Sequence, residues 1–125
     1  MKIEWRVITT LTNYKEVINS FLSHSVKSSG NYISSGNILY LFGNKIAQHT
    51  DNGIEVSYCG WQTPTTNKAI HQIINMTPTD YSFSIKKGII NVERCVNYAW
   101  YDHTMLDSND IFNLTTGVTT TGDKI

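Results

Sequence analysis

Apolar residues recur at helical spacing over the segment Tyr14–Val26. The members of this stripe, spaced at i, i+3, i+4, i+7, i+8 and i+12, are Tyr14, Val17, Ile18, Phe21, Leu22 and Val26. Such spacing gives one apolar face to a helix of about three to four turns. Asn13 and Glu16 are spaced like a capping box at its start, and Ser28-Ser29-Gly30 is expected to end it. A looser alternation over residues 3–9 predicts a strand before the helix.

A meander of strands is predicted next. Residues 37–42 form an apolar run of strand length, Gly43-Asn44 suits a two-residue turn, and residues 45–50 form the returning strand. Asn52-Gly53 is a strong hairpin signal. Residues 54–59 then alternate apolar and polar side chains, which is typical of a strand with one solvent-facing side.

Gly60 and Trp61 interrupt this alternation, and the pattern predicts a second, shorter helix after them. We expect Thr65 or Thr66 to cap this helix and Pro78 to close it. The isoleucines expected on its inner side are Ile70, Ile73 and Ile74.

Alternating residues return in the last part of the chain. Residues 81–86 predict a strand, Lys87-Gly88 a turn, and residues 89–93 the returning strand. The alternation of residues 96–100 either extends that strand past a bulge or forms another one. Ile111, Phe112 and Leu114 are expected to dock on the domain as a last short segment.

The order of these elements predicts an α+β fold: a mostly antiparallel sheet, made of a β-meander and a hairpin, with two helices on one face. At 125 residues the chain has the length of one domain. We place that domain at residues 1–114. Residues 115–125 are rich in Thr and Gly without apolar periodicity, and we expect them to form a flexible tail.

Charge is scarce and balanced. Lys and Arg number 10, Asp and Glu number 10, and the formal net charge is zero. Non-specific nucleic-acid binding depends on a clustered surplus of basic residues, so this balance disfavours it. A hydrophobic share of 40% excludes a disordered regulator. The longest apolar run, Ile38–Phe42, is far shorter than the ~20 residues of a membrane helix.

The compartment follows from the N-terminal segment and the cysteines. Residues 1–6 carry charges where a signal peptide has its apolar segment, so we expect a soluble protein that is not exported. In a reducing cytosol, Cys59 and Cys95 are then expected to be free thiols.

Metal and catalytic motifs are not evident. Cys59, His71, Cys95 and His103 lack the close pairing of zinc ligands. The tail segment 117–124 resembles a phosphate-binding loop but has Asp123 where the lysine belongs. No serine lies in a G-x-S-x-G motif. We therefore expect no enzyme, no cofactor and no metal.

The segment Gly60–Lys68 is the strongest candidate for a binding site. Its candidate residues are Trp61, Thr63, Thr65, Thr66 and Lys68. Hydroxyls and N–H groups at a helix start, together with a lysine, suit an anion, and an exposed tryptophan suits stacking on a base. The alternative is structural: the threonines cap and turn the chain, and the tryptophan covers one end of the core.

The segment 36–75 also resembles a known group of proteins. The elements that carry the resemblance are Asn37-Ile38-Leu39-Tyr40, Gly43, Ile46-Ala47, Asn52-Gly53-Ile54-Glu55-Val56, Gly60-Trp61-x-Thr63-x-Thr65-Thr66 and Ile70. They are similar to the "strand, I-A, strand, W-x-T-x-T-T, helix" core of small, uncharacterised tailed-bacteriophage proteins. In that group the helix often carries more basic residues, whereas here only Lys68 and His71 fill that role. The resemblance implies a phage protein acting in the host cytoplasm, with no activity attached.

Three functions follow as hypotheses. The first is a non-enzymatic phage accessory protein that binds a macromolecular partner, in the first place a protein of the host or of a defence system and otherwise a phage protein. The second is a nucleic-acid or nucleotide binder that uses the segment from Trp61 to Lys68. The third is a minor structural component of the particle, with the Thr-rich tail as a docking arm.

Overall fold

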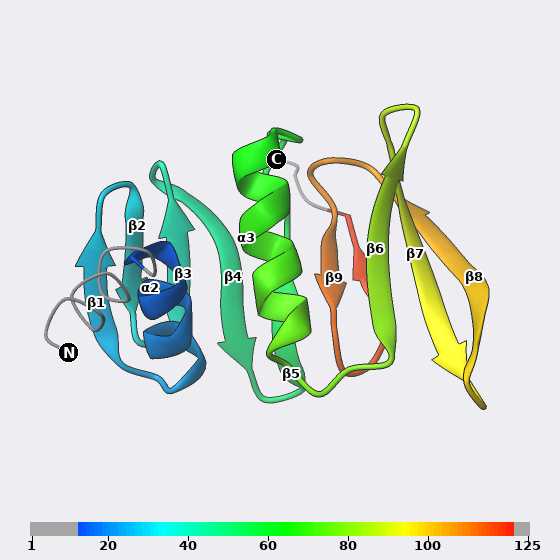
Figure 1. Cartoon of the computed structure of the whole chain (residues 1–125), viewed down its shortest axis with the longest axis horizontal. Helices are drawn as coiled ribbons and strands as arrows, with labels where there is room; N and C mark the ends of the chain where they lie inside the picture. Colours follow the sequence, from blue (N-terminus) through cyan, green and yellow to red (C-terminus); the bar gives the residue numbers. More distant parts are fainter. Residues whose placement is uncertain (1–12, 122–125) are drawn as a thin grey trace, which may run out of the picture.

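The computed structural model describes residues 13–121, which form two antiparallel sheets and two helices (Figure 1). This arrangement confirms the predicted α+β class. The strand predicted over residues 3–9 lies outside the described residues.

The larger sheet has seven strands in the order β1-β2-β3-β4-β5-β9-β10, and every neighbouring pair is antiparallel. Its strands are β1 (Val26–Ser29), β2 (Tyr32–Ser35), β3 (Ile38–Leu41), β4 (Asn44–Thr50), β5 (Gly53–Val56), β9 (Ile111–Asn113) and β10 (Thr119–Thr120). The five strands from β1 to β5 form a continuous meander, in which β3, β4 and β5 confirm the predicted strands, and β1 and β2 are additional strands that the sequence did not predict. The smaller sheet has the order β6-β7-β8, from β6 (Tyr81–Lys86), β7 (Ile89–Val96) and β8 (Ala99–Leu106).

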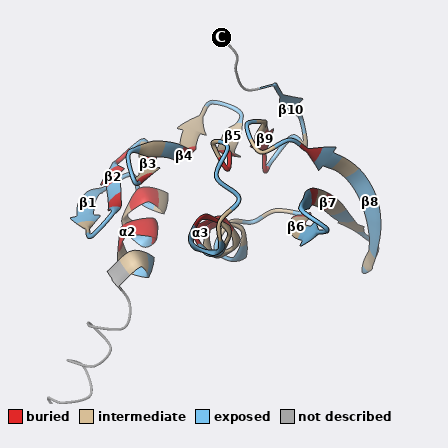
Figure 2. Ribbon diagram, turned by 90° about the horizontal axis from the view of Figure 1, so that it is seen from above, coloured by how far each residue is buried: buried red, intermediate tan, exposed pale blue. Residues whose placement is uncertain are grey.

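Both helices lie on the same side of the seven-stranded sheet (Figure 2). Helix α2 (Asn13–Leu22) packs on β1, β2 and β3, and α3 (Pro64–Asn75) lies between α2 and β6. The predicted apolar stripes cause this placement, because Val17, Ile18 and Phe21 of α2 are fully buried. The corresponding buried residues of α3 are Thr66, Ala69, Ile70 and Ile73.

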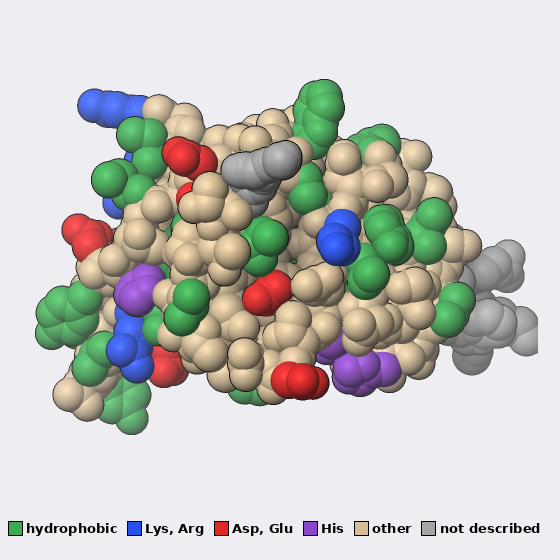
Figure 3. Space-filling model, turned by 180° about the vertical axis from the view of Figure 1, so that it is seen from behind, with side chains coloured by type: hydrophobic (Ala, Val, Ile, Leu, Met, Phe, Trp, Pro, Cys, Tyr) green, Lys and Arg blue, Asp and Glu red, His purple; other side chains and the backbone are tan. Residues whose placement is uncertain are grey.

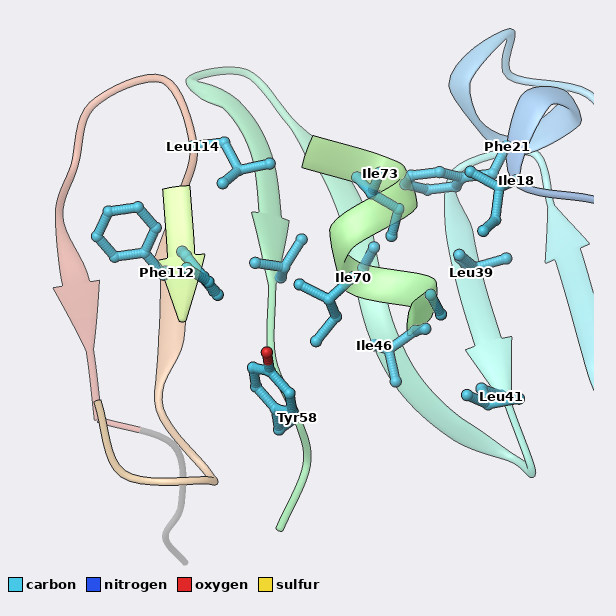
Figure 4. Packing of buried hydrophobic residues seen from close by; sticks show 14 of the residues in the cluster. Ile18, Phe21, Leu39, Leu41, Ile46, Tyr58, Ile70, Ile73, Phe112 and Leu114 are labelled. Carbon is cyan, nitrogen blue, oxygen red and sulfur yellow. The ribbon is translucent and has the colours of Figure 1, made fainter. Parts of the chain in front are cut away.

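One hydrophobic core joins the helices to both sheets. Ile70 and Ile73 of α3 face the larger sheet, with Ile18 and Phe21 of α2 beside them (Figure 4). Phe112 of β9 makes edge contacts with Tyr81 and Phe83 of β6, at ring-centroid distances of 5.2 and 5.5 Å. The last predicted segment therefore docks as expected, and its buried Phe112 connects the two sheets.

Helix α2 ends earlier than its apolar stripe predicts. The Ser25 N–H donates to the Ser20 carbonyl at 2.7 Å, and the His24 N–H donates to the Phe21 carbonyl at 3.0 Å. His24 has a φ of 60°. This is a Schellman ending, with histidine at the position that glycine usually takes. The prediction that Ser28-Ser29-Gly30 ends the helix is wrong, because Val26–Ser29 is strand β1.

Two turns also differ from the expected ones. The β3–β4 turn consists of Phe42 and Gly43, with φ of 54° and 79°, since Leu41 pairs with Asn44. The expected turn, Gly43-Asn44, is therefore one residue too late. The alternation of residues 96–100 conceals a turn at Asn97-Tyr98, which separates β7 from β8 and gives the smaller sheet its third strand.

Residues 115–121 are held against the fold, where the sequence predicts a flexible tail. Thr119 and Thr120 pair with β9, and the Gly117 N–H donates to the Asn113 carbonyl at 2.9 Å. The buried Asn113 side chain accepts hydrogen bonds from the Thr115 and Thr116 N–H groups at 2.8 and 2.9 Å. Backbone hydrogen bonding thus orders a segment that lacks apolar periodicity. Residues 122–125 lie outside the described residues.

Candidate functional site

Trp61 lies on the loop between β5 and α3, and its side chain is 58% exposed. Before it, Cys59 and Gly60 both have positive φ, 55° and 83°, and the Trp61 N–H donates to the Tyr58 carbonyl at 2.8 Å. This tight turn directs the chain away from the sheet and toward the start of α3. Trp61 is therefore not buried at the end of the core, as one of the two interpretations of the sequence would require.

Contacts with three other segments hold the Trp61 loop in place. The Gly60 N–H donates to the Ser108 carbonyl at 2.9 Å, and the Gln62 side chain donates to the Gly88 carbonyl at 2.8 Å. The Cys59 thiol lies 2.9 Å from the Lys45 carbonyl, to which it donates. An exposed tryptophan on such a fixed loop loses little conformational entropy when it binds.

Thr63 is the N-cap of α3. Its Oγ1 accepts a hydrogen bond from the Thr66 N–H at 3.2 Å and lies 3.1 Å from Thr66 Oγ1. Pro64 follows at the first helical position, where a missing N–H costs nothing. The prediction of Thr65 or Thr66 as the cap is wrong, because Thr63 caps the helix two or three residues earlier and the helix starts at Pro64.

The capping hydrogen bonds limit what the start of α3 can bind. Pro64 has no N–H, the Thr66 N–H is used by Thr63 Oγ1, and the Asn67 N–H donates to the Thr63 carbonyl at 2.9 Å. Within residues 13–121, only the Thr65 N–H of this first turn has no such partner. An anion at this position would therefore meet one donor rather than the usual group.

A pocket of about 320 Å³ lies beside Trp61. It is lined by Trp61, Thr63, Thr66, Phe42 and Asn44. The structure thus brings together three of the five predicted site residues and adds two from the β3–β4 hairpin. The sequence pattern indicated neither Phe42 nor Asn44 as a site residue. The one signal in the sequence was the pair Phe42-Gly43, which forms a turn that exposes the phenylalanine ring. We call these five residues the Trp61 pocket.

Thr65 and Lys68 do not line the Trp61 pocket. Both are exposed on α3, and the Lys68 ammonium group lies over the Tyr14 ring of α2, 5.1 Å from its centroid. Lys68 therefore lies apart from the tryptophan and the two hydroxyls that share the pocket. The pocket has two aromatic rings, one amide and two hydroxyls, with no charged side chain.

Two ionisable side chains, Tyr58 and Cys59, come just before Trp61 in the sequence, and burial favours the neutral form of both. Burial raises the pKa of the Tyr58 phenol above its usual value near 10, and its hydroxyl donates to the Asn67 side chain at 2.7 Å. Burial also raises the pKa of the Cys59 thiol, against smaller lowering effects of Ser57 and Lys45. Both groups are therefore in their protonated form near neutral pH.

A second exposed aromatic surface lies on the β7–β8 hairpin, at the end of the molecule opposite β1. Tyr98 at its turn is fully exposed, and Trp100 and Tyr101 of β8 are exposed by 54% and 58%. In the space-filling view from behind, this end lies on the left, where exposed hydrophobic side chains are interspersed with charged ones (Figure 3). The sequence showed the aromatics but not the turn that exposes them.

The described residues also bear on whether the protein holds a metal site or a membrane-spanning helix. Between residues 13 and 121, no three His, Cys, Asp or Glu side chains are close enough to share a metal ion. Cys59 and Cys95 are both free thiols and half-buried. Neither of the two described helices, of 10 and 12 residues, is long and apolar enough to cross a membrane.

Comparison with known proteins gives one match. The family model described as Kyanoviridae Gp96 protein matches residues 1–117. No curated protein and no solved structure matches the chain. The expected resemblance to small phage proteins is confirmed at this level, although the match does not bear on the W-x-T-x-T-T element. Since the match covers nearly the whole chain, the protein belongs to the Kyanoviridae Gp96 family of phage proteins.

Proposed function

We propose that this phage protein is a non-enzymatic accessory protein that binds a macromolecular partner in the host cytoplasm, first of all a protein of the host or of its defence systems. The placement of Phe42 and Tyr98 carries the proposal. Their side chains are exposed by 59% and 100%, and both residues occupy left-handed turn positions, with φ of 54° and 66°.

The Tyr98 side chain is fully exposed, so no contact within the described fold compensates for an aromatic residue at that position, whereas Phe42 is partly covered in the Trp61 pocket. A left-handed conformation costs an ordinary L-residue about 1 kcal/mol or more, which is why Gly, Asn and Asp are usual there. The Tyr98 ring recovers little of that cost, because it removes almost no apolar surface from water. A partner that covers the rings on binding would supply the missing stabilisation.

The Trp61 pocket supports the same function. Tryptophan, tyrosine and other aromatics are enriched at the centres of protein interfaces, and binding energy concentrates on such residues. Trp61 and Phe42 offer two exposed rings beside the Asn44 amide, on a loop whose conformation is already fixed. The uncharged lining favours a neutral or apolar side chain of a partner protein over a charged ligand.

Affinity capture with matched variants tests the proposal. Tagged wild-type protein is expressed during infection, and bound proteins are identified by mass spectrometry beside a Trp61→Ala, Phe42→Asn double variant. Asn suits the left-handed position of residue 42, so the backbone is preserved. Val26→Ser, which changes a residue of β1 that is 78% exposed, is the control.

The expected result is a specific host or phage protein that the control retains and the double variant loses. A partner retained equally by all three proteins would refute a role for the Trp61 pocket. If Tyr98→Asn also left binding unchanged, the proposal that a partner covers the exposed rings of Phe42 and Tyr98 would be wrong.

Nucleic-acid or nucleotide binding is the second candidate function, and the exposed rings of Trp61 and Phe42 in the Trp61 pocket favour it. Such rings can stack on a base. Against it stand the position of Lys68 over Tyr14 and the single remaining N–H at the start of α3. A salt titration with a fluorescent single-stranded oligonucleotide decides the question. Binding that weakens with salt and is lost in Trp61→Ala supports this candidate, and salt-independent or unchanged binding excludes it.

A further inference from the structure

Strand β8 is an unusual sheet edge. Among the described residues, the outer strands of the two sheets are β1, β10, β6 and β8. Strand β1 has four residues including Lys27, β10 has two residues, and β6 ends in Lys86 and packs beside α3. Strand β8 has eight residues, with no Lys, Pro or Gly. It thus lacks the short length and the Lys or Pro that often prevent an edge from pairing with another strand, and its protective features are Asp102 and a bulge.

The turn geometry shows which backbone groups of β8 face outward. In a two-residue hairpin, the residues that close the loop exchange hydrogen bonds, and here these are Val96 and Ala99. Because the direction alternates along the strand, the N–H and C=O groups of Trp100 and Asp102 point away from β7. They are the groups available to a further strand.

A bulge limits this free edge to one part of β8. Val92 pairs with Thr104 and Glu93 with Asp102, so His103 is the extra residue. Its Nε2 lies 3.0 Å from the Gly117 carbonyl, to which it donates, and its ring contacts Tyr81 at 4.9 Å between centroids. The regular edge therefore runs from Ala99 to Asp102 and ends at this bulge.

We infer that this edge pairs with β8 of a second copy of the chain, antiparallel, with Tyr101 at the two-fold axis. Trp100 then lies opposite Asp102 of the second copy, and four backbone hydrogen bonds form. A register that places Asp102 opposite itself would bring two carboxylates together, which is unfavourable. A register centred on Trp100 would need Tyr98, whose φ of 66° takes it out of the strand.

The charge and exposure of the chain agree with a second copy as the occupant. A net charge of zero leaves no long-range repulsion between copies. Tyr101 and Trp100, on opposite faces of the strand, are both more than half exposed and would lose solvent contact on pairing. The paired segment is short, so the buried area falls below that of permanent dimers, and dimerisation will depend on concentration in about the micromolar range or above.

Sedimentation velocity of the purified protein over about 1 µM to 1 mM measures the association directly. Trp100→Pro and Trp100→Val both remove the ring, but only proline removes the outward N–H. Since proline leaves the β7–β8 ladder intact, it is tolerated at such an edge position. We expect Trp100→Pro to weaken self-association about tenfold or more relative to Trp100→Val, because two of the four hydrogen bonds are lost.

Cross-linking keeps the test decisive if the proline variant does not fold. In a background with Cys59→Ser and Cys95→Ser, the variant Tyr101→Cys places two thiols across the axis, about 4.5 Å apart at Cα, which permits a disulfide. Met105→Cys, an exposed position of the same strand beyond the bulge, is the matched control. Rapid oxidative dimerisation of Tyr101→Cys alone supports the pairing. A monomer at all concentrations, equal association of the two Trp100 variants, or equal cross-linking at both cysteines would overturn it.

Discussion

Replacing Thr63 by alanine tests how the start of α3 is built. Thr63 Oγ1 accepts from the Thr66 N–H at 3.2 Å, and loss of such an N-cap typically costs about 1 kcal/mol. The same substitution removes the neighbour of Thr66 Oγ1, which lies 3.1 Å away on a side chain that is 4% exposed. A buried hydroxyl left without a partner costs about another 1 kcal/mol. The expected loss in the free energy of unfolding is therefore about 2 kcal/mol.

Two variants separate this explanation from a general effect of threonine removal. Thr63→Ser keeps the hydroxyl and is expected to stay within about 0.5 kcal/mol of the wild type. Thr65→Ala alters an exposed threonine in the first turn, which the sequence pattern offers as an alternative cap, and is expected to have a similarly small effect. Urea unfolding followed by circular dichroism measures all three, and for a chain of this length the Thr63→Ala loss corresponds to a fall in Tm of about 8 °C.

The reasoning would be refuted by either of two results. If Thr65→Ala destabilises the protein as much as Thr63→Ala, the helix does not begin as described. If Thr63→Ser is as unstable as Thr63→Ala, the hydroxyl is not the group that matters.

Three further predictions concern groups around the same core. Tyr58→Phe removes a hydrogen bond and is expected to lower the free energy of unfolding by about 1 kcal/mol. Because burial raises the pKa of Tyr58, the contribution of its protonated phenol to stability is present below about pH 10 and is lost as the pH rises further. The free energy of unfolding should therefore fall less steeply with alkaline pH in Tyr58→Phe than in the wild type. Gly117→Ala, at a φ of 75°, would place a Cβ against the Tyr81 hydroxyl and should destabilise the protein more than Gly88→Ala, at a φ of 78° with open space; equal Tm values would contradict this. Since burial raises the pKa of the Cys59 thiol, iodoacetamide at about pH 8 should modify it more slowly than a free cysteine in a peptide, and the difference should shrink as the pH is raised; peptide mapping shows whether it does.

The parts of the fold that follow from the sequence are those in which local pattern and tertiary packing agree. The α3 stripe with Ile70 and Ile73 is buried as its spacing predicts, and the alternation at Tyr81 and Phe83 gives a strand with one buried side. Phe112 docks in the core as expected. In each case the apolar periodicity is the physical cause of the burial, so it is also visible in the sequence.

The parts that do not follow depend on unusual residues at left-handed positions. The α2 ending uses His24, and the hairpin turns use Phe42 and Tyr98, where sequence patterns favour Gly or Asn. Propensity rules therefore extended α2 too far and left open whether β7 and β8 are one strand or two. Only part of the Trp61 pocket could be predicted, for a related reason. Phe42 reaches the pocket through a turn that the sequence pattern does not predict.

The pairing of β5 with β9 also governs how the chain folds. Every other strand pair within residues 13–121 joins neighbours in sequence, whereas Glu55 pairs with Asn113, 58 positions further along the chain. Closing so long a loop costs conformational entropy before the contacts between β5 and β9 can compensate for it. The meander, the smaller sheet and α3 can therefore form first, and β9 completes the core last. Destabilising substitutions at Phe112 should accordingly speed unfolding and leave the refolding rate almost unchanged.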